Sequence, residues 1–312
     1  MRASEAVLVD ADGPSLAPAQ ARPWIVAILA SYNRQALTLG CLEALKQSAD
    51  DADVVVEAIL VDDASPDGTA RAVRERFAWV QVVEGSGTLF WNRAMHKGFA
   101  LAMQRPADHY LWLNDDTLLN RDAIGRLLRQ VTALRQDHGR PLILVGATAD
   151  PHTGVISYGG RVRDSRLRPF HYRLVWHADE PVPCHVMEGN CVLIPREVAR
   201  RVGNLDPFFE HAMGDTDYAL RARRAGVDLF VSGGVVGVCS RNPKEGSYAD
   251  RRVPFRHRWQ MILGKKGLPV RSWMHFCRRH GGPLWPLHFA WPYTKLMISG
   301  LRALLEMLPF EL

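Results

Sequence analysis

The chain has 312 residues, of which 47% are hydrophobic and 23% are charged, and its formal net charge at pH 7 is +6. This composition is typical of a globular protein and excludes wholesale disorder and fibrous repeats. The length allows one large α/β domain or two smaller ones.

The positive charge is concentrated in the C-terminal part of the sequence. Residues 241–312 carry a net charge of +9, whereas residues 1–240 carry a net charge of −3. This asymmetry predicts an acidic partner for the C-terminal part, such as a phospholipid surface, a nucleic acid or a phosphorylated lipid.

The N-terminus and the cysteines indicate the compartment. Residues 1–23 contain Glu5, Asp10 and Asp12 among small residues and prolines, so we expect a flexible leader rather than a signal peptide. The cysteine count is odd and no pair has CxxC spacing. Neither a disulfide framework nor a cysteine zinc site is indicated, and reduced thiols in the cytosol fit best.

Over residues 24–145, short apolar runs alternate with apolar residues at helical spacing. This rhythm predicts a doubly wound, mostly parallel sheet with ligands at the carboxyl ends of its strands. The last of these helices is expected to be capped by Asn120. The predicted strands cover 24–30, 54–61, 80–83, 110–113 and 142–145, and the predicted helices cover 37–45, 67–77, 90–103 and 124–134.

The second half is less regular. It predicts one α/β domain over 24–240, followed by a basic, Trp-rich and helical extension over 241–312. The predicted elements are a hairpin at 154–160, a strand over 186–194 that runs into a helix over 195–202, a helix over 215–225 and a strand over 227–231.

The end of the chain has an amphipathic helical pattern. Residues 281–294 are uncharged, but they are too short and too rich in proline to span a bilayer. The helix that follows can either lie in a membrane interface, together with Trp residues from 273 onward, or pack on its own domain. Its apolar face comprises Met297, Ile298, Leu301, Leu304, Leu305 and Leu308.

Carboxylates follow two of the predicted strands. Asp62 and Asp63 come directly after the strand over 54–61. Asp115 and Asp116 follow the strand over 110–113 after one intervening residue, Asn114. Adjacent carboxylates at a buried strand end repel each other, which a bound cation relieves. Solvated turns built by Asx capping remain the alternative for both pairs.

A third acidic cluster opens the helix over 215–225. Asp215 can serve either as a helix cap or as a general base presented into the crevice. For Asp217, an ion pair with Arg221 one helical turn later is a competing interpretation.

In this order, the clusters resemble the motifs of family 2 glycosyltransferases, which are inverting enzymes of the GT-A fold. The resemblance covers roughly residues 24–240 and is closest to the rhamnosyltransferase-like subgroup of bacterial polysaccharide assembly. The motifs that carry it are Ala30-Ser31-Tyr32-Asn33-Arg34, Val61-Asp62-Asp63-Ala64-Ser65-Pro66-Asp67-Gly68-Thr69, Asn114-Asp115-Asp116, and Asp206-Pro207-Phe208-Phe209 with Asp215-Thr216-Asp217-Tyr218-Ala219-Leu220-Arg221.

The resemblance implies a role for each motif. Asp116 is expected to ligate Mg²⁺ or Mn²⁺, and Asp215 to deprotonate the acceptor hydroxyl. The nucleotide-diphosphate sugar, of UDP or dTDP type, is expected to contact Tyr32, Asn33, Arg34, Asp62, Asp63 and Asp115.

Other candidates come from the residues themselves and keep an alternative. Arg93 can either approach the diphosphate or be a solvated helix residue. Glu188, Gly189 and Asn190 can either contact the acceptor or form a bulge, and Asp217 is a further candidate for acceptor contact.

Three positions depart from the family pattern. Gly214 stands where Glu commonly precedes the base, and His96 stands where the family has Asn. Cys239 lies where many relatives carry a metal-binding His. Because a thiol is a poor match for Mg²⁺, a buried structural thiol is the favoured interpretation of Cys239.

The sequence therefore predicts a glycosyltransferase that acts on a glycan or lipid-linked glycan in surface polysaccharide assembly. It is expected in the cytoplasm, with peripheral membrane contact through residues 273–312 and without nucleic acid as a partner. A sugar nucleotidyltransferase is the alternative, although the loop after the first strand has no glycine. A non-catalytic nucleic-acid-binding protein is the third hypothesis, and the acidic 1–240 segment argues against it.

Overall fold

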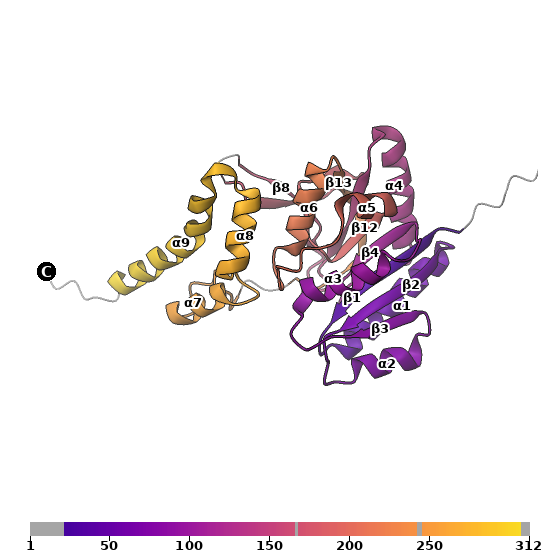
Figure 1. Ribbon diagram of the computed structural model, residues 1–312, viewed down its shortest axis with the longest axis horizontal. Coiled ribbons are helices and arrows are strands. Elements are labelled where there is room, and N and C mark those ends of the chain that lie inside the picture. The colour runs from indigo at the N-terminus through magenta and orange to yellow at the C-terminus, as the bar shows by residue number, and fades with distance from the viewer. Residues whose placement is uncertain (1–21, 166–167, 242–244, 307–312) are drawn as a thin grey trace, which may run out of the picture.

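The computed structural model describes residues 22–165, 168–241 and 245–306, and a large sheet forms its centre (Figure 1). In the first half of the chain the strands are β1 (Trp24–Ser31), β2 (Val55–Asp62), β3 (Val80–Glu84), β4 (His109–Leu113), β5 (Leu118–Leu119) and β6 (Leu142–Ala149). The helices between them are α1 (Gln35–Asp51), α2 (Thr69–Arg76), α3 (Phe90–Ala102) and α4 (Ala123–His138).

The second half adds shorter strands and the C-terminal helices. The strands are β7 (Ile156–Tyr158), β8 (Gly160–Arg163), β9 (Tyr172–Val175), β10 (Val182–Pro183), β11 (Val186–Met187), β12 (Cys191–Pro195) and β13 (Asp228–Val238). The helices are α5 (Arg196–Val202), α6 (Gly214–Arg224), α7 (Phe255–Leu263), α8 (Val270–His280) and α9 (Trp285–Glu306), with a 3₁₀ turn at Gly282–Leu284.

The central sheet has ten strands and is mainly parallel. Its main order is β10-β13-β6-β12-β4-β1-β2-β3, with β5 on β13 and β7 on β6. β1 pairs in parallel with both β2 and β4, in a register that sets Ser31 beside Asp62 and Ile28 beside Trp112. The carboxyl ends of these three strands therefore meet at one edge, as the alternating pattern predicted. A separate three-stranded sheet has the order β11-β8-β9.

Side chains that alternate along the strands bury both faces of the central sheet. On one face, Ile25 and Leu29 of β1 pack with α1, α2 and α4. On the other face, Val26 and Ile28 pack with α3, α5, α6 and α8. Burial on both faces explains why the strands read as continuous apolar runs in the sequence.

Several local predictions need correction. The strand predicted over 186–194 is two strands, because residues 188–190 form a turn between β11 and β12. The hairpin is made by β6 and β7, and its turn contains the hydrogen bond from Gly154 N–H to the Asp150 carbonyl at 2.9 Å. Asn120 does not cap α4: the N-cap residue is Asp122, and the Asn120 amide donates to the Val235 carbonyl at 3.0 Å.

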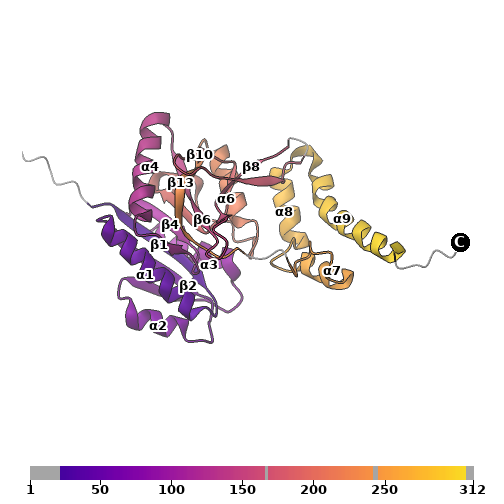
Figure 2. The ribbon, with the colours of Figure 1, turned by 180° about the vertical axis from the view of Figure 1, so that it is seen from behind.

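The helices α7, α8 and α9 lie together beside the sheet, and α8 faces α6 (Figures 1 and 2). Trp273, Phe276 and Cys277 of α8 belong to the core on the α6 side of the sheet. A helical C-terminal region is therefore present, as predicted. The domain boundary at residue 240 stays a prediction, and residues 1–21 of the predicted leader lie outside the described residues.

The apolar face of α9 points away from the protein. Met297, Ile298 and Leu301 are 57%, 44% and 59% exposed, whereas Leu296 is 4% exposed. Ser299 of the polar side accepts a hydrogen bond from Arg258 at 3.2 Å, whereas Lys295 of that side is exposed. Packing of this face on its own domain is therefore wrong for these three residues. Of the predicted face, the side chains of Leu304, Leu305 and Leu308 lie outside the described part.

Among the helices described here, none combines the length and the apolar character needed to cross a membrane. All five cysteines are free thiols in buried positions.

Candidate active site

Strained backbone gathers at the edge of the sheet where β1, β2 and β4 end. Of the five non-glycine residues with positive φ in the described ranges, four lie on loops at this edge. They are Asn33 after β1, Ala64 after β2, Phe90 at the start of α3 and Met213 just before α6. Such conformations cost free energy and concentrate at functional sites, so they mark this edge as a candidate site.

Asp63 holds the loop that leads into α3. Its carboxylate accepts the backbone N–H groups of Gly87 at 2.8 Å, Leu89 at 2.8 Å and Phe90 at 3.0 Å. Gly85 is needed for this approach, because a Cβ there would lie 2.5 Å from the Asp63 Oδ1 atom. In the described arrangement Asp63 therefore shapes the loop over 85–90, and its contact with a nucleotide stays a prediction.

Asp62 builds the turn after β2. It accepts the Ser65 backbone N–H at 3.1 Å and also the Ser65 hydroxyl, and this hydroxyl accepts the Asn33 N–H at 2.9 Å. The loops after β1 and β2 are thus joined through Ser65. Tyr32, in the first of these loops, is 55% exposed, so its ring is accessible to a planar ligand.

Asp115 and Asp116 both form an ion pair with the side chain of Arg34. The Arg34 Nη1 atom lies 3.1 Å from Asp115 Oδ1 and 2.9 Å from Asp116 Oδ2. Burial raises the pKa of Asp115 to about 6 despite the opposing effect of Arg34. The other Asp115 oxygen, Oδ2, is buried without a hydrogen-bond partner among the described residues. The pair is therefore an acidic site that requires positive charge.

Cys239 lies directly beside this pair. Its thiol is 2% exposed and 3.4 Å from Asp116 Oδ1, and the Asn190 amide donates to the sulfur at 3.4 Å. Burial and then Asp116 raise the pKa of Cys239 to about 12. Cys239 is therefore the buried protonated thiol that the sequence favoured, although it lies next to the predicted metal ligand.

Asp215 begins α6 with its carboxylate held from two sides. It accepts the Gly189 N–H at 3.2 Å and the Thr216 N–H at 2.7 Å. Burial raises the pKa of Asp215, and these two N–H groups oppose the rise. A carboxylate that is oriented by N–H groups and has a raised pKa has the properties of a general base.

Glu188 lies next to Asp215. Its carboxylate forms an ion pair with Arg161 of β8 at 2.7 Å. Burial raises the pKa of Glu188, Arg161 opposes this, and the negative charge of Asp215 adds to it. The two carboxylates therefore sense each other, and Arg161 is a member of the site that the sequence analysis missed.

The turn over 188–190 joins Asp215 to the acidic pair. Gly189 packs on Trp91 so closely that a Cβ there would lie 2.4 Å from the indole ring. The Trp91 N–H donates to the Asn114 side chain at 2.8 Å, and the Asn190 carbonyl accepts the Asn114 N–H at 2.9 Å. The predicted base and the predicted metal ligand thus flank one short turn.

Two predicted site residues are engaged elsewhere. Arg93 donates to the Pro207 carbonyl at 3.0 Å and pairs with Glu210 at 3.2 Å. Asp217 is fully buried, and its carboxylate contacts cationic or ring nitrogens of α6 and α8. The structure therefore does not bring Asp217 to the turn over 188–190, and the ion-pair interpretation describes it.

The departure at Gly214 has a steric cause. A Cβ at this position would lie 1.7 Å from the Asn92 side-chain oxygen. Asn92 is fully buried and donates to the carbonyls of Asp206 and Phe209, each at 2.8 Å. A glutamate before Asp215 is therefore incompatible with Asn92 in this position.

Residues 26–148 match the family model described as Glycosyl transferase family 2. The match runs through the strands β1 to β6 and includes Arg34 and both acidic pairs, but it ends before Asp215. Two curated relatives, Rv1525 of Mycobacterium tuberculosis and Mb1552 of Mycobacterium bovis, are uncharacterized proteins that are 30% identical over 152 residues. These alignments cover 46% of this chain, which spans about half (51%) of each relative's length.

A solved structure extends the likeness of the fold. It is the mannosyltransferase PcManGT from Pyrobaculum calidifontis in complex with GDP-Man and Mn²⁺, with a TM-score of 0.55 and 19% identity. The likeness covers 92% of this chain and 75% of that one. The fold is the GT-A type that the sequence predicted. The family match concerns residues 26–148, and the likeness to the solved structure concerns the fold.

Proposed function

We propose that this chain is an inverting, metal-dependent glycosyltransferase. It moves a sugar from a nucleotide-diphosphate sugar to a hydroxyl of a glycan or lipid-linked glycan in bacterial-type surface polysaccharide assembly. A rhamnosyltransferase-like activity is the subgroup that the sequence motifs favour. The observation that carries the proposal is the turn over 188–190, which contacts Asp215 on one side and, on the other, Asn114, the residue directly before the acidic pair.

Asp215 acts as the general base. The acceptor hydroxyl gives its proton to the Asp215 carboxylate while its oxygen attacks the anomeric carbon, and the bond from that carbon to the diphosphate oxygen breaks. A single displacement from the opposite face inverts the anomeric configuration. Because Gly189 and Thr216 fix both carboxylate oxygens, the base is oriented before the acceptor arrives.

Asp115 and Asp116 fit a divalent ion of the Mg²⁺ or Mn²⁺ type. Asp115 has a buried oxygen without a described partner, and Arg34 already supplies a cation to both carboxylates. The described residues contain no group of three His, Cys, Asp or Glu side chains placed to hold a metal. Few protein ligands are typical of ions that are completed by substrate phosphates. When bound, such an ion stabilises charge on the diphosphate leaving group.

The loops after β1, β2 and β3 form the donor side of this site. Tyr32 offers an exposed ring to the nucleobase, and Asp62 and Asp63 keep the loops over 62–65 and 85–90 in place. Asp115 and Asp116 would hold a divalent ion in place of Arg34, whose guanidinium would then be available to pair with the diphosphate.

The first test is a screen of UDP-, dTDP- and GDP-sugars for thermal stabilisation of the full chain with Mn²⁺. One nucleotide class is expected to raise the Tm with Mn²⁺ present and to have a much smaller effect with EDTA, because binding to the folded state stabilises it by mass action. Asp116→Ala is expected to remove the Mn²⁺-dependent part. Equal stabilisation of this variant would contradict the metal assignment.

The enzyme is proposed to work at the inner face of the cytoplasmic membrane. Leu287, Trp291 and Leu301 of α9 are each about 60% exposed, and the segment over 241–312 carries a net charge of +9. An apolar helix face with basic surroundings suits an anionic lipid interface. The full chain is expected to sediment with phosphatidylglycerol vesicles and not with phosphatidylcholine vesicles. Absence of sedimentation with both would rule this contact out.

A further inference from the structure

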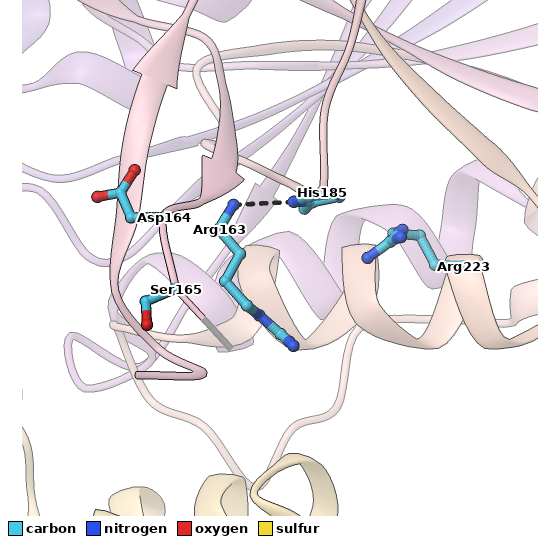
Figure 3. A pocket seen from close by; sticks show the side chains of 5 residues that line it. All are labelled: Arg163, Asp164, Ser165, His185 and Arg223. Carbon is cyan, nitrogen blue, oxygen red and sulfur yellow. Dashed lines mark hydrogen bonds between the residues drawn. The ribbon is translucent and has the colours of Figure 1, made fainter. Parts of the chain in front are cut away.

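A cationic pocket lies outside the site described above, between β8 and the end of α6 (Figure 3). Its volume is about 380 Å³, and Arg163, His185 and Arg223 line it together with Asp164 and Ser165. An adjoining cavity of about 280 Å³ shares both arginines and adds Arg224 and His280 to the lining. We call these two cavities the basic pocket.

The arginines of the basic pocket are not neutralised. Asp164 is the one acidic residue that lines it, but the Asp164 carboxylate pairs with His171 at 2.8 Å and Arg173 at 3.3 Å. Figure 3 shows the Asp164 carboxylate turned away from Arg163 and Arg223. Within the described ranges, neither of these guanidinium groups forms an ion pair. Two cationic groups that face one cavity without a counter-ion are suited to an anion.

The positive charge of the two arginines affects the neighbouring His185. Burial lowers the pKa of His185, and Arg223 and Arg163 lower it further. His185 is therefore neutral at pH 7, and its Nδ1 atom accepts the Arg163 backbone N–H at 2.8 Å. The remaining proton is then on Nε2, which makes His185 a third donor beside the two arginines. Three donors of this kind match the oxygens of a phosphate group.

Exposed apolar side chains follow the pocket in the chain. His280, which lines the pocket, ends α8, and Leu284 and Leu287 follow within seven residues and are 59% and 66% exposed. Phe170, from the segment between β8 and β9, packs on Trp273 of α8 and on His288 of α9. The segment that follows β8, which contributes Asp164 and Ser165 to the pocket, is thus packed against the helices that carry these exposed apolar side chains.

The pocket also has a fixed relation to the proposed base. Asp215 and Arg223 lie on the same helix, α6, eight residues apart. At about 1.5 Å of rise per residue this separates them by about 12 Å along the helix. A phosphate held at Arg223 would therefore lie about 12 Å along the helix from Asp215, a separation that a short glycan can span.

We infer that the basic pocket binds the phosphate group of a lipid-linked acceptor. This inference rests on the proposed glycosyltransferase function, because it assigns the acceptor of that same site. The same chemistry would also accept a soluble phosphate, so the test has to separate the two sources. The lipid-linked source is favoured by the exposed apolar side chains that follow the pocket in the chain.

The test compares vesicles that contain phosphatidic acid with vesicles that contain phosphatidylglycerol, matched for surface potential. Phosphatidic acid can carry two negative charges on its phosphate, as a lipid-linked diphosphate does, whereas phosphatidylglycerol carries one, so the full chain is expected to bind phosphatidic acid more tightly. The double variant Arg163→Gln, Arg223→Gln is expected to lose this preference, with at least about tenfold weaker binding to phosphatidic acid. Its binding to phosphatidylglycerol is expected to stay near that of the unmodified chain.

The matched control is the double variant Arg200→Gln, Arg201→Gln, which makes the same charge change at the exposed end of α5. It is expected to keep the preference for phosphatidic acid. Loss of the preference in this control, or its retention in the pocket variant, would overturn the inference. Binding of inorganic pyrophosphate without any preference for phosphatidic acid would assign the pocket to a soluble phosphate and also overturn it.

The outcome is independent of the proposed catalytic function. Vesicle binding needs neither donor nor metal, and the pocket variant is expected to keep the Mn²⁺-dependent stabilisation by the donor. If that stabilisation is absent from the unmodified chain while the vesicle preference is present, the proposed function fails and the phosphate site stands.

Discussion

Replacing Asp215 by Asn is expected to lower kcat by about 10²–10⁴-fold, because an amide cannot take the acceptor's proton. The variant keeps the shape of the side chain, and its carbonyl oxygen can still accept the N–H group of Gly189 or Thr216, which now hold Asp215. Donor binding and the Tm are therefore expected to change little. The measurement is the rate of nucleoside-diphosphate release at saturating donor and acceptor.

A matched control separates this effect from a general loss of charge. Asp122 occupies the N-cap position of α4, which packs on the other face of the sheet, and Asp122→Asn makes the same chemical change there. This control is expected to keep the activity of the unmodified chain. Asp215→Asn with undiminished kcat would exclude Asp215 as the base.

The pH dependence follows from the same carboxylate. Because burial raises the pKa of Asp215, the base becomes protonated at a higher pH than an ordinary aspartate. Activity is therefore expected to fall as the pH decreases through this raised pKa. Burial also raises the pKa of Asp115 to about 6, so its protonation adds to the acid limb.

The second large effect concerns stability. Replacing Asp217 by Asn is expected to lower the free energy of unfolding by about 3 kcal/mol, since it removes the counter-charge of Arg221 and one of the two carboxylates that pair with Arg279. The Asp217 carboxylate is 0% exposed and contacts Arg221 at 2.8 Å, Arg279 at 2.9 Å and His280 at 2.8 Å. These contacts hold α6, whose second residue is the proposed base Asp215, against α8.

Urea unfolding measures this prediction, with Asp50→Asn as the control. Asp50 pairs with Lys46 at a separation of one helical turn, as Asp217 does with Arg221, but both members of this pair are solvent-exposed. An exposed pair of this kind contributes about 0–1 kcal/mol. Equal destabilisation by the two variants would show that the buried cluster has no special role.

Acid is expected to weaken the same cluster. Hydrogen bonds from His280 and Arg221 outweigh burial and lower the pKa of Asp217 to about 2, so its contribution is present above about pH 4 and is lost as the pH falls toward 2. Burial lowers the pKa of His280 despite the opposing effect of Asp217. The unfolded chain therefore binds a proton at His280 first, and stability also decreases as the pH falls below about 6.5.

Much of the fold could be predicted from local patterns. The strands β1, β2, β3, β4 and β6 and the helices between them could be predicted from the sequence. Each of these elements is long enough to show the spacing of apolar residues that is typical of its type. The antiparallel insertion of β12 between β4 and β6 was missed, because strand order is set by long-range pairing. Amphipathic periodicity does not encode which strand becomes a neighbour.

The site shows the same limit. Asp62, Asp63, Asp115 and Asp116 were found because carboxylates followed predicted strands. The partners of these carboxylates could not be predicted, because an acidic pair in the sequence does not show which cationic side chain or N–H group will contact it. The Arg34 contact with Asp115 spans 81 residues, and the Asp63 contact with Leu89 spans 26.

The positions of Asp217 and Arg93 illustrate a further cause. Both residues are charged and lie near predicted motifs, but their tertiary contacts hold the side chains away from the turn over 188–190 and the acidic pair. Asp217 is closed off by Arg279, which lies 62 residues later on α8, and Arg93 by the carbonyl of Pro207. Charge and position along the chain therefore indicate candidate site residues. The burial and contacts of each side chain in the fold determine which of them are accessible to a ligand.

The most direct test of the central claim is a turnover measurement with the donor found by thermal stabilisation. The purified full chain is incubated with that nucleotide sugar and a glycan acceptor, with Mn²⁺ or with EDTA, and released nucleoside diphosphate and the anomeric configuration of the product are followed. The account predicts release that requires the divalent ion and Asp215, and a product of inverted configuration. Metal-independent release, a product of retained configuration, or no turnover of any nucleotide sugar would contradict it.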